Sequence, residues 1–119
     1  MSHKILIVED NDDARIMLKR MLELEGYDVF QAVDGYEAVE QTQEKHPDLI
    51  LMDMALPGMD GLSATREIRK TENVSDIPVI GVTAHGHFYN DKAIAAGCDA
   101  IISKPISHQL LNTMVSLYL

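Results

Sequence analysis

Short apolar runs alternate with longer segments of helical periodicity along the whole of this 119-residue chain. The first run, Lys4–Val8, reads KILIV and is rich in β-branched residues, as is typical of a strand buried on both faces of a parallel sheet. Because strands that are joined by helices lie parallel, the alternation indicates an α/β fold. The other strands are predicted at Asp28–Ala32, Leu49–Asp53, Ile77–Ala84 and Ala100–Ser103.

A helical segment follows each predicted strand. Five such units are too few for an eight-stranded barrel, so the sequence predicts an open, three-layer, doubly wound domain. No linker or repeat interrupts the pattern, and residues 1–119 are expected to form a single domain. We expect the helices to span Asp12–Glu25 with Asn11 or Asp12 as cap, an Asp34-capped segment through Lys45, about Leu62–Lys70, a segment ending near Gly97, and a last segment capped by Ser107.

The net charge, the cysteine content and the lengths of the apolar runs exclude several classes of protein. A formal net charge of -9 disfavours direct binding to nucleic acid or to an anionic membrane surface, because neither polyanion is attracted to an acidic protein. The single cysteine, Cys98, excludes an intramolecular disulfide and is typical of a reducing compartment. The first apolar stretch reaches Glu9 too soon for a signal peptide, and no later run has the length of a membrane span. We therefore expect a cytoplasmic protein.

Polar side chains stand where the predicted strands end. Glu9 and Asp10 follow the first strand, Asp53 closes the third, and Thr83 lies near the end of the fourth. Lys104 follows the fifth. Functional groups of a doubly wound sheet gather beyond the carboxyl ends of its strands. Three carboxylates, a hydroxyl and an ammonium therefore meet at one edge if the first, third, fourth and fifth strands are neighbours.

Three carboxylates at one sheet edge indicate a site for a divalent cation. Oxygen ligands of this kind suit Mg²⁺, and clustered carboxylates repel one another unless a cation neutralises them. A nucleophilic carboxylate beside a metal and a lysine is suited to accepting a phosphoryl group, since such transfer depends mainly on positioning and charge neutralisation. The hypothesis is that Asp53 is the acceptor.

Other functions that use this kind of sheet fit the residues less well. A flavin carrier or a P-loop nucleotide enzyme needs a glycine-rich or hydroxyl-rich loop to cradle a phosphate, whereas the loop after the first strand reads EDNDD. A phosphatase of the haloacid dehalogenase type also forms an aspartyl phosphate with Mg²⁺. Enzymes of that type carry a second aspartate two residues beyond the nucleophile, where this chain has Ala55.

Four separated motifs resemble the receiver domains of bacterial two-component response regulators. The motifs are ILIVEDN, DLILMDMALPGMDG, IPVIGVTA and AGCDAIISKPI, and the resemblance covers the chain from Lys4 to nearly its end. It is greatest to stand-alone receivers of the chemotaxis-regulator kind and to receivers attached to hybrid kinases. The resemblance implies a flavodoxin-like sheet in the order 2-1-3-4-5 and a phosphorylation-dependent signalling switch of a two-component phosphorelay.

The resemblance also implies a role for each residue at the strand ends. Asp53 accepts a phosphoryl group from the phosphohistidine of a sensor histidine kinase or a histidine phosphotransferase, and Lys104 pairs with a phosphoryl oxygen. Asp10 and Asp53 ligate Mg²⁺ directly. Glu9 acts on the metal through water, and the backbone carbonyl of Ala55 completes the protein ligands.

The resemblance places a switch beside the acceptor. Thr83 moves to hydrogen-bond another phosphoryl oxygen and shifts the loop that begins at Ala84, which changes the surface of the fourth helix, fifth strand and fifth helix. That surface is expected to bind a downstream protein effector, and a transient homodimer through it is a further implication. His85 tunes the phosphoryl lifetime, and Pro105 holds Lys104 at the site through a cis bond.

One position departs from the pattern of the family. Three residues before Lys104 the family has Tyr or Phe, and this chain has Ile101, so coupling is expected to rely more on the Thr83 loop. We expect no turnover of an external substrate, because the domain assists only its own phosphorylation and slow hydrolysis. The alternatives are a degenerate receiver that acts as a phosphorylation-independent docking module and the aspartyl-phosphate phosphatase.

Overall fold

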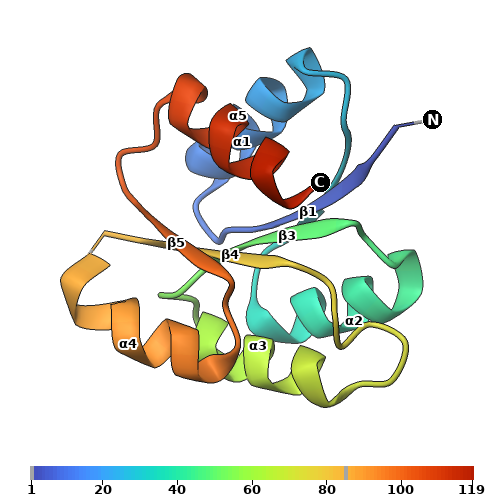
Figure 1. The fold of residues 1–119 in the computed structure, drawn as a ribbon, viewed down its shortest axis with the longest axis vertical. Coiled ribbons are helices and arrows are strands. Elements are labelled where there is room, and N and C mark those ends of the chain that lie inside the picture. The colour runs from blue at the N-terminus through green and yellow to red at the C-terminus, as the bar shows by residue number, and fades with distance from the viewer. Residues whose placement is uncertain (1, 85) are drawn as a thin grey trace.

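Parallel strands form a single five-stranded sheet (Figure 1). The strands are β1 (Lys4–Val8), β2 (Asp28–Ala32), β3 (Leu49–Asp53), β4 (Val79–Thr83) and β5 (Ala100–Ser103). This computed structural model describes residues 2–84 and 86–119, the side chains of 86–88 excepted. The strands lie in the order β2-β1-β3-β4-β5, and every neighbouring pair is parallel. The predicted flavodoxin-like sheet is confirmed.

Helices cover both faces of the sheet and complete the three predicted layers. The helices are α1 (Asp12–Leu24), α2 (Gly35–Lys45), α3 (Gly61–Lys70), α4 (Gly86–Ala96) and α5 (His108–Tyr118). In Figure 1, α1 and α5 lie above the sheet, and α2, α3 and α4 lie below it. None of the helices in the described part of the chain has both the length and the apolar character that crossing a membrane requires.

Side-chain caps begin four of the helices. Each cap accepts a hydrogen bond from the backbone N–H three residues further on, at 2.8–3.0 Å. Three of these caps were predicted, and the fourth, Asp60, explains why α3 begins at Gly61 rather than at Leu62. At the other end of α1, Glu25 is the C-terminal cap, so the helix is one residue shorter than predicted. The four capping residues are Asn11, Asp34, Asp60 and Ser107.

The fourth strand is also shorter than the predicted span of Ile77–Ala84. Pro78 has no N–H to donate, and it meets β3 only through its carbonyl, which accepts from the Ile50 N–H at 2.9 Å. The strand therefore begins at Val79, and it ends at Thr83, which lies at the carboxyl edge of the sheet.

Two apolar clusters fill the space between the layers. Every residue of β3 and β4 is buried, as expected for strands that are covered on both faces. The cluster under α1 and α5 includes Ile7 and Leu111, and the cluster on the opposite face includes Met52 and Ile68. Because close-packed strands move little relative to one another, groups at their carboxyl ends are held at fixed separations.

Arg69 at the end of α3 joins the loops at the opposite edge of the sheet. Its guanidinium donates two hydrogen bonds to the Gly97 carbonyl, at 3.0 and 2.8 Å, and one each to the carbonyls of Ser75 and Ile77. It also pairs with the Asp99 carboxylate at 3.0 Å. A single side chain thus ties the α3–β4 loop to the α4–β5 turn.

Replacing Arg69 should therefore destabilise the fold. We expect Arg69→Met to lower the free energy of unfolding by about 2–4 kcal/mol, because several partly buried carbonyls lose a charged donor. Arg66→Met on the exposed face of the same helix is the control and should stay within about 0.5 kcal/mol of the wild type. Urea denaturation measures both changes, and equal losses in the two variants would contradict the structural role of Arg69.

Candidate functional site

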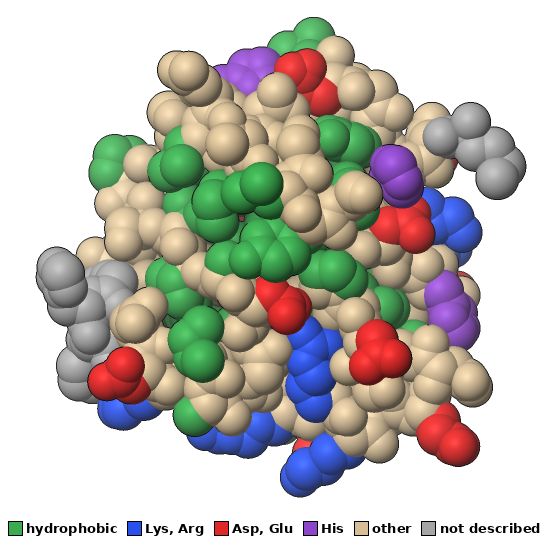
Figure 2. All heavy atoms as spheres, viewed as in Figure 1, with side chains coloured by type: hydrophobic (Ala, Val, Ile, Leu, Met, Phe, Trp, Pro, Cys, Tyr) green, Lys and Arg blue, Asp and Glu red, His purple; other side chains and the backbone are tan. Residues whose placement is uncertain are grey.

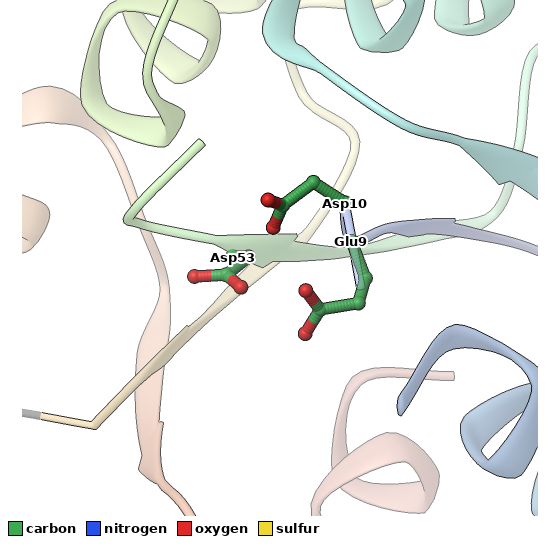
Figure 3. Close-up of side chains that lie close together, drawn as sticks. All are labelled: Glu9, Asp10 and Asp53. Atoms are coloured by element: carbon green, nitrogen blue, oxygen red, sulfur yellow. The ribbon is translucent and has the colours of Figure 1, made fainter. Parts of the chain in front are cut away.

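The carboxyl ends of β1 and β3 lie side by side at the point where the winding of the sheet reverses. From β1 the chain crosses to β2 on one side, and from β2 it crosses back to β3 on the other. Such a reversal leaves a crevice above the strand ends. Glu9 and Asp10 follow β1 directly, and Asp53 is the last residue of β3. Figure 3 shows their three carboxylates close together around the ends of these strands.

The three carboxylates form one cluster. Each residue offers an oxygen that lies within 4.8 Å of the oxygens offered by the other two. Asp10 is exposed, whereas Glu9 and Asp53 are buried, with only 2% and 4% of their surface accessible. Negative charges at such separations repel one another, so the cluster needs a compensating cation.

Asp53 is held from two directions. Its Oδ1 accepts a hydrogen bond from the Ala55 N–H at 2.9 Å, and its Oδ2 accepts one from Lys104 Nζ at 3.0 Å. The two donors fix the orientation of the carboxylate group. The site thus presents a buried, oriented carboxylate at the end of a rigid strand.

Glu9 shares the same lysine. Its Oε1 accepts from Lys104 Nζ at 3.0 Å, and its Oε2 accepts from the Asn11 N–H at 3.1 Å. Lys104 therefore bridges two buried carboxylates at the carboxyl ends of β1 and β3. The bridge brings the predicted lysine to the predicted acceptor.

The position of Lys104 affects its own pKa in two opposite ways. Partial burial lowers the pKa of the ammonium, and the hydrogen bonds and charges of Glu9 and Asp53 raise it by more. The net pKa lies above the usual lysine value of 10.5, so the side chain stays protonated at neutral pH.

The other predicted residues lie along the same edge. Thr83 ends β4 and is 2% exposed, and its carbonyl accepts from the Lys104 N–H at 2.8 Å. Ala84 is exposed just beyond Thr83, and the Lys104–Pro105 peptide bond is cis, as predicted. His85 lies outside the described residues.

Ile101 lies on β5 opposite Gly81 of β4. Its side chain is partly buried and packs against the cluster on the α2–α4 face, where its Cδ1 would stand 2.7 Å from a Cβ at Gly81. Such a contact is shorter than side chains tolerate, so the glycine makes room for the isoleucine. The side chain at this position therefore faces the core.

The carboxylate oxygens at this edge of the sheet are suitable ligands for a small divalent cation. Carboxylate oxygens are hard ligands, and the exposed Asp10 leaves the cluster open to water on one side. A cation here would offset the charge that Lys104 alone leaves uncompensated.

Arg15 on α1 was not singled out from the sequence, although it contacts the acidic loop. Its Nη1 donates to the carbonyl of Glu9 at 2.9 Å, and its Nη2 pairs with Asp12 at 2.6 Å. The signal in the sequence was a basic residue three positions after an acidic one at the start of a helix.

Known proteins match this chain over nearly its whole length. The pattern of the response regulator receiver domain matches residues 5–116. The polar-differentiation response regulator DivK of Brucella ovis is 41% identical over 108 residues, which cover 90% of this chain and 88% of that protein. The sensor protein EvgS of Escherichia coli is 37% identical over 113 residues, which cover 94% of this chain but 9% of EvgS.

Solved structures are also similar. The receiver domain of the sensor histidine kinase PA1611 of Pseudomonas aeruginosa superposes with a TM-score of 0.93 at 35% identity, over 99% of this chain and 98% of that one. That structure holds a magnesium ion coordinated in its active-site cleft. The chemotaxis protein CheY4 of Vibrio cholerae superposes with a TM-score of 0.94 at 26% identity, over the full length of both chains.

The pairing of Lys104 with two buried carboxylates predicts a pH dependence of stability. Because the pKa of Lys104 is raised on folding, its contribution is complete below the unfolded pKa and is lost as pH rises through the higher folded pKa. We expect Lys104→Met to be less stable than the wild type at pH 7, and the difference to disappear well above pH 10.5.

Urea denaturation of both proteins across this pH range tests the prediction. Lys70→Met, at an exposed position in the last turn of α3, is the matched control. A difference between wild type and Lys104→Met that does not shrink at alkaline pH would show that the ammonium charge is not what stabilises the cluster.

Proposed function

This chain belongs to the family of response regulator receiver domains of two-component signalling, and we propose that it is a phospho-accepting switch with Asp53 as the acceptor. Receiver domains work with histidine kinases and with downstream effectors. The donor proposed here is the phosphohistidine of a sensor histidine kinase or a histidine phosphotransferase.

The surroundings of the Asp53 carboxylate carry this proposal. It is buried, accepts hydrogen bonds from two donors, and is joined by Lys104 to a second carboxylate just beyond the neighbouring strand. A purely structural aspartate would not need a shared lysine and two further carboxylates within 4.8 Å. Clustered carboxylates lower the stability of the fold. A reaction that adds and removes negative charge at this site would explain why they are there.

The transfer requires little covalent chemistry from the protein. An Asp53 oxygen forms a bond to phosphorus as the bond between phosphorus and the donor imidazole nitrogen breaks, and that nitrogen takes up a proton. Lys104 exchanges its contact with the Asp53 carboxylate for one with a phosphoryl oxygen. The Thr83 hydroxyl donates a hydrogen bond to another phosphoryl oxygen.

The acidic cluster is the proposed site of Mg²⁺. Asp10 and Asp53 would ligate it directly, Glu9 through water, and Ala55 through its backbone carbonyl. When bound, the ion neutralises the charge of the incoming phosphoryl group. The magnesium ion in the PA1611 receiver structure supports this assignment.

The proposed output lies on the surface of α4, β5 and α5. Figure 2 shows hydrophobic side chains gathered near the middle of this face, beside β5 and α5. Large hydrophobic residues such as Ile94 of α4 and Leu117 of α5 are exposed, at 50% and 71%. Movement of Thr83 and of the loop from Ala84 would reshape this surface for a downstream protein effector or for a second copy of the chain.

Ile101 limits the ways in which the switch can work. Because this side chain already faces the core over Gly81, the signal is proposed to pass through the Thr83 loop. The domain would promote only its own phosphorylation and slow hydrolysis, without turnover of an external substrate. The exposed Ala55 leaves space for attacking water next to Asp53.

Intact-mass spectrometry after incubation with acetyl phosphate tests the proposal. We expect one phosphoryl adduct that requires both Mg²⁺ and Asp53, so that Asp53→Asn shows none, because the amide is not a nucleophile for phosphorus. Asp48→Asn, a carboxylate at the opposite edge of the sheet, is the control and should still form the adduct.

The other outcomes separate the alternatives. An adduct on Asp53→Asn would mean that another residue is the acceptor. No adduct and no release of phosphate would support a docking module, whereas rapid release of phosphate without an adduct would support the phosphatase.

A further inference from the structure

We infer that Arg15 is a positioning residue for the cation site, which it serves by fixing the peptide that connects Glu9 to Asp10; this inference rests on the function proposed above. Arg15 does not contact the carboxylate oxygens of Glu9 or Asp53 in the hydrogen bonds of the described residues. It acts on the peptide between Glu9 and Asp10, whose carbonyl it binds.

The guanidinium of Arg15 joins three parts of the fold. Nη1 donates to the Glu9 carbonyl at 2.9 Å, Nη2 pairs with Asp12 at 2.6 Å, and Nε donates to Gln31 Oε1 of β2 at 3.2 Å. The Arg15 side chain is 13% exposed while that of Asp12 is 80% exposed, so the bonds to the Glu9 carbonyl and to Gln31 are the ones partly shielded from water. Charge-assisted bonds in such surroundings are directional and strong.

These contacts fix the orientation of the backbone immediately before Asp10. The amide of Glu9 is fixed by its hydrogen bond to the Ala32 carbonyl at 3.1 Å. The carbonyl of Glu9 belongs to the next peptide plane, which leads to the Cα of Asp10. Arg15 therefore sets the orientation of that plane. Asp10 is the exposed member of the cluster, and its carboxylate depends on the backbone for its position.

The charge of Arg15 and its geometry predict opposite effects on a cation. A positive charge near the site repels Mg²⁺, so removing the charge alone would tighten binding. A fixed peptide plane keeps Asp10 within reach of its fellow ligands, so releasing it would weaken binding. Lysine keeps the charge but cannot reproduce three fixed donors, and Arg15→Lys therefore separates the two effects.

Isothermal titration with Mg²⁺ tests the inference. We expect the dissociation constant to rise about tenfold in both Arg15→Lys and Arg15→Gln, a loss typical of residues that orient metal ligands. Gln31→Leu removes one contact of the guanidinium and should cause a smaller rise. Arg20→Lys and Arg20→Gln, at an exposed position on the same helix, are the controls and should match the wild type.

A second measurement distinguishes positioning from general loss of structure. With acetyl phosphate, the rate of Asp53 phosphorylation at saturating Mg²⁺ should return to within about twofold of the wild-type rate in each Arg15 variant, because only the cation affinity is impaired. Circular dichroism tests whether the variants are folded. If an Arg15 variant is not folded, the Mg²⁺ dissociation constant of Gln31→Leu tests the inference in its place.

The outcomes are distinct. Unchanged Mg²⁺ affinity in both Arg15 variants would overturn the inference and leave the proposed function intact. Tighter Mg²⁺ binding by Arg15→Gln, together with unchanged affinity in Arg15→Lys, would do the same. A wild-type protein that neither binds Mg²⁺ nor forms the phosphoryl adduct would overturn the proposed function, and this inference with it.

Discussion

Repulsion between the carboxylates of Glu9, Asp10 and Asp53 is the constraint on which the rest of the site depends. Three negative charges that lie within 4.8 Å of one another are unfavourable, and Lys104 compensates only part of that charge. The fold tolerates the cluster because tightly packed strands hold it in place. The uncompensated charge is why a cation is proposed at this site, and the Lys104 ammonium is the proposed partner of an incoming phosphoryl group.

Sheet order turns residues that are far apart in the chain into one site. Glu9 and Lys104 are 95 positions apart, yet Lys104 Nζ lies 3.0 Å from Glu9 Oε1. The same order puts Thr83 at the end of β4, where its carbonyl binds the backbone of Lys104. A change at Asp53 can therefore reach β4 and β5 through a few direct contacts. The exposed hydrophobic residues of α4 and α5 lie on the helices that follow these two strands.

The sequence predicted the larger features because they depend on local patterns. Apolar periodicity located the strands, caps such as Asp34 located helix ends, and the polar residues at strand ends indicated where the site would form. Two kinds of feature were beyond its reach. The residue at which β4 begins depends on which backbone groups of β3 and β4 pair with each other. The contacts of Arg15 depend on the distance between α1 and β2. The roles assigned to individual site residues remain predictions.

The most direct measurement is a crystal structure of the protein grown with Mg²⁺ and beryllofluoride, a stable mimic of the phosphoryl group. We expect beryllofluoride bonded to an Asp53 oxygen, in contact with Lys104 Nζ and the Thr83 hydroxyl, and a metal ion between Asp10 and Asp53. Beryllofluoride on another carboxylate, or a metal ion bound away from Asp10 and Asp53, would contradict the assignment of Asp53 as the acceptor beside a cation site.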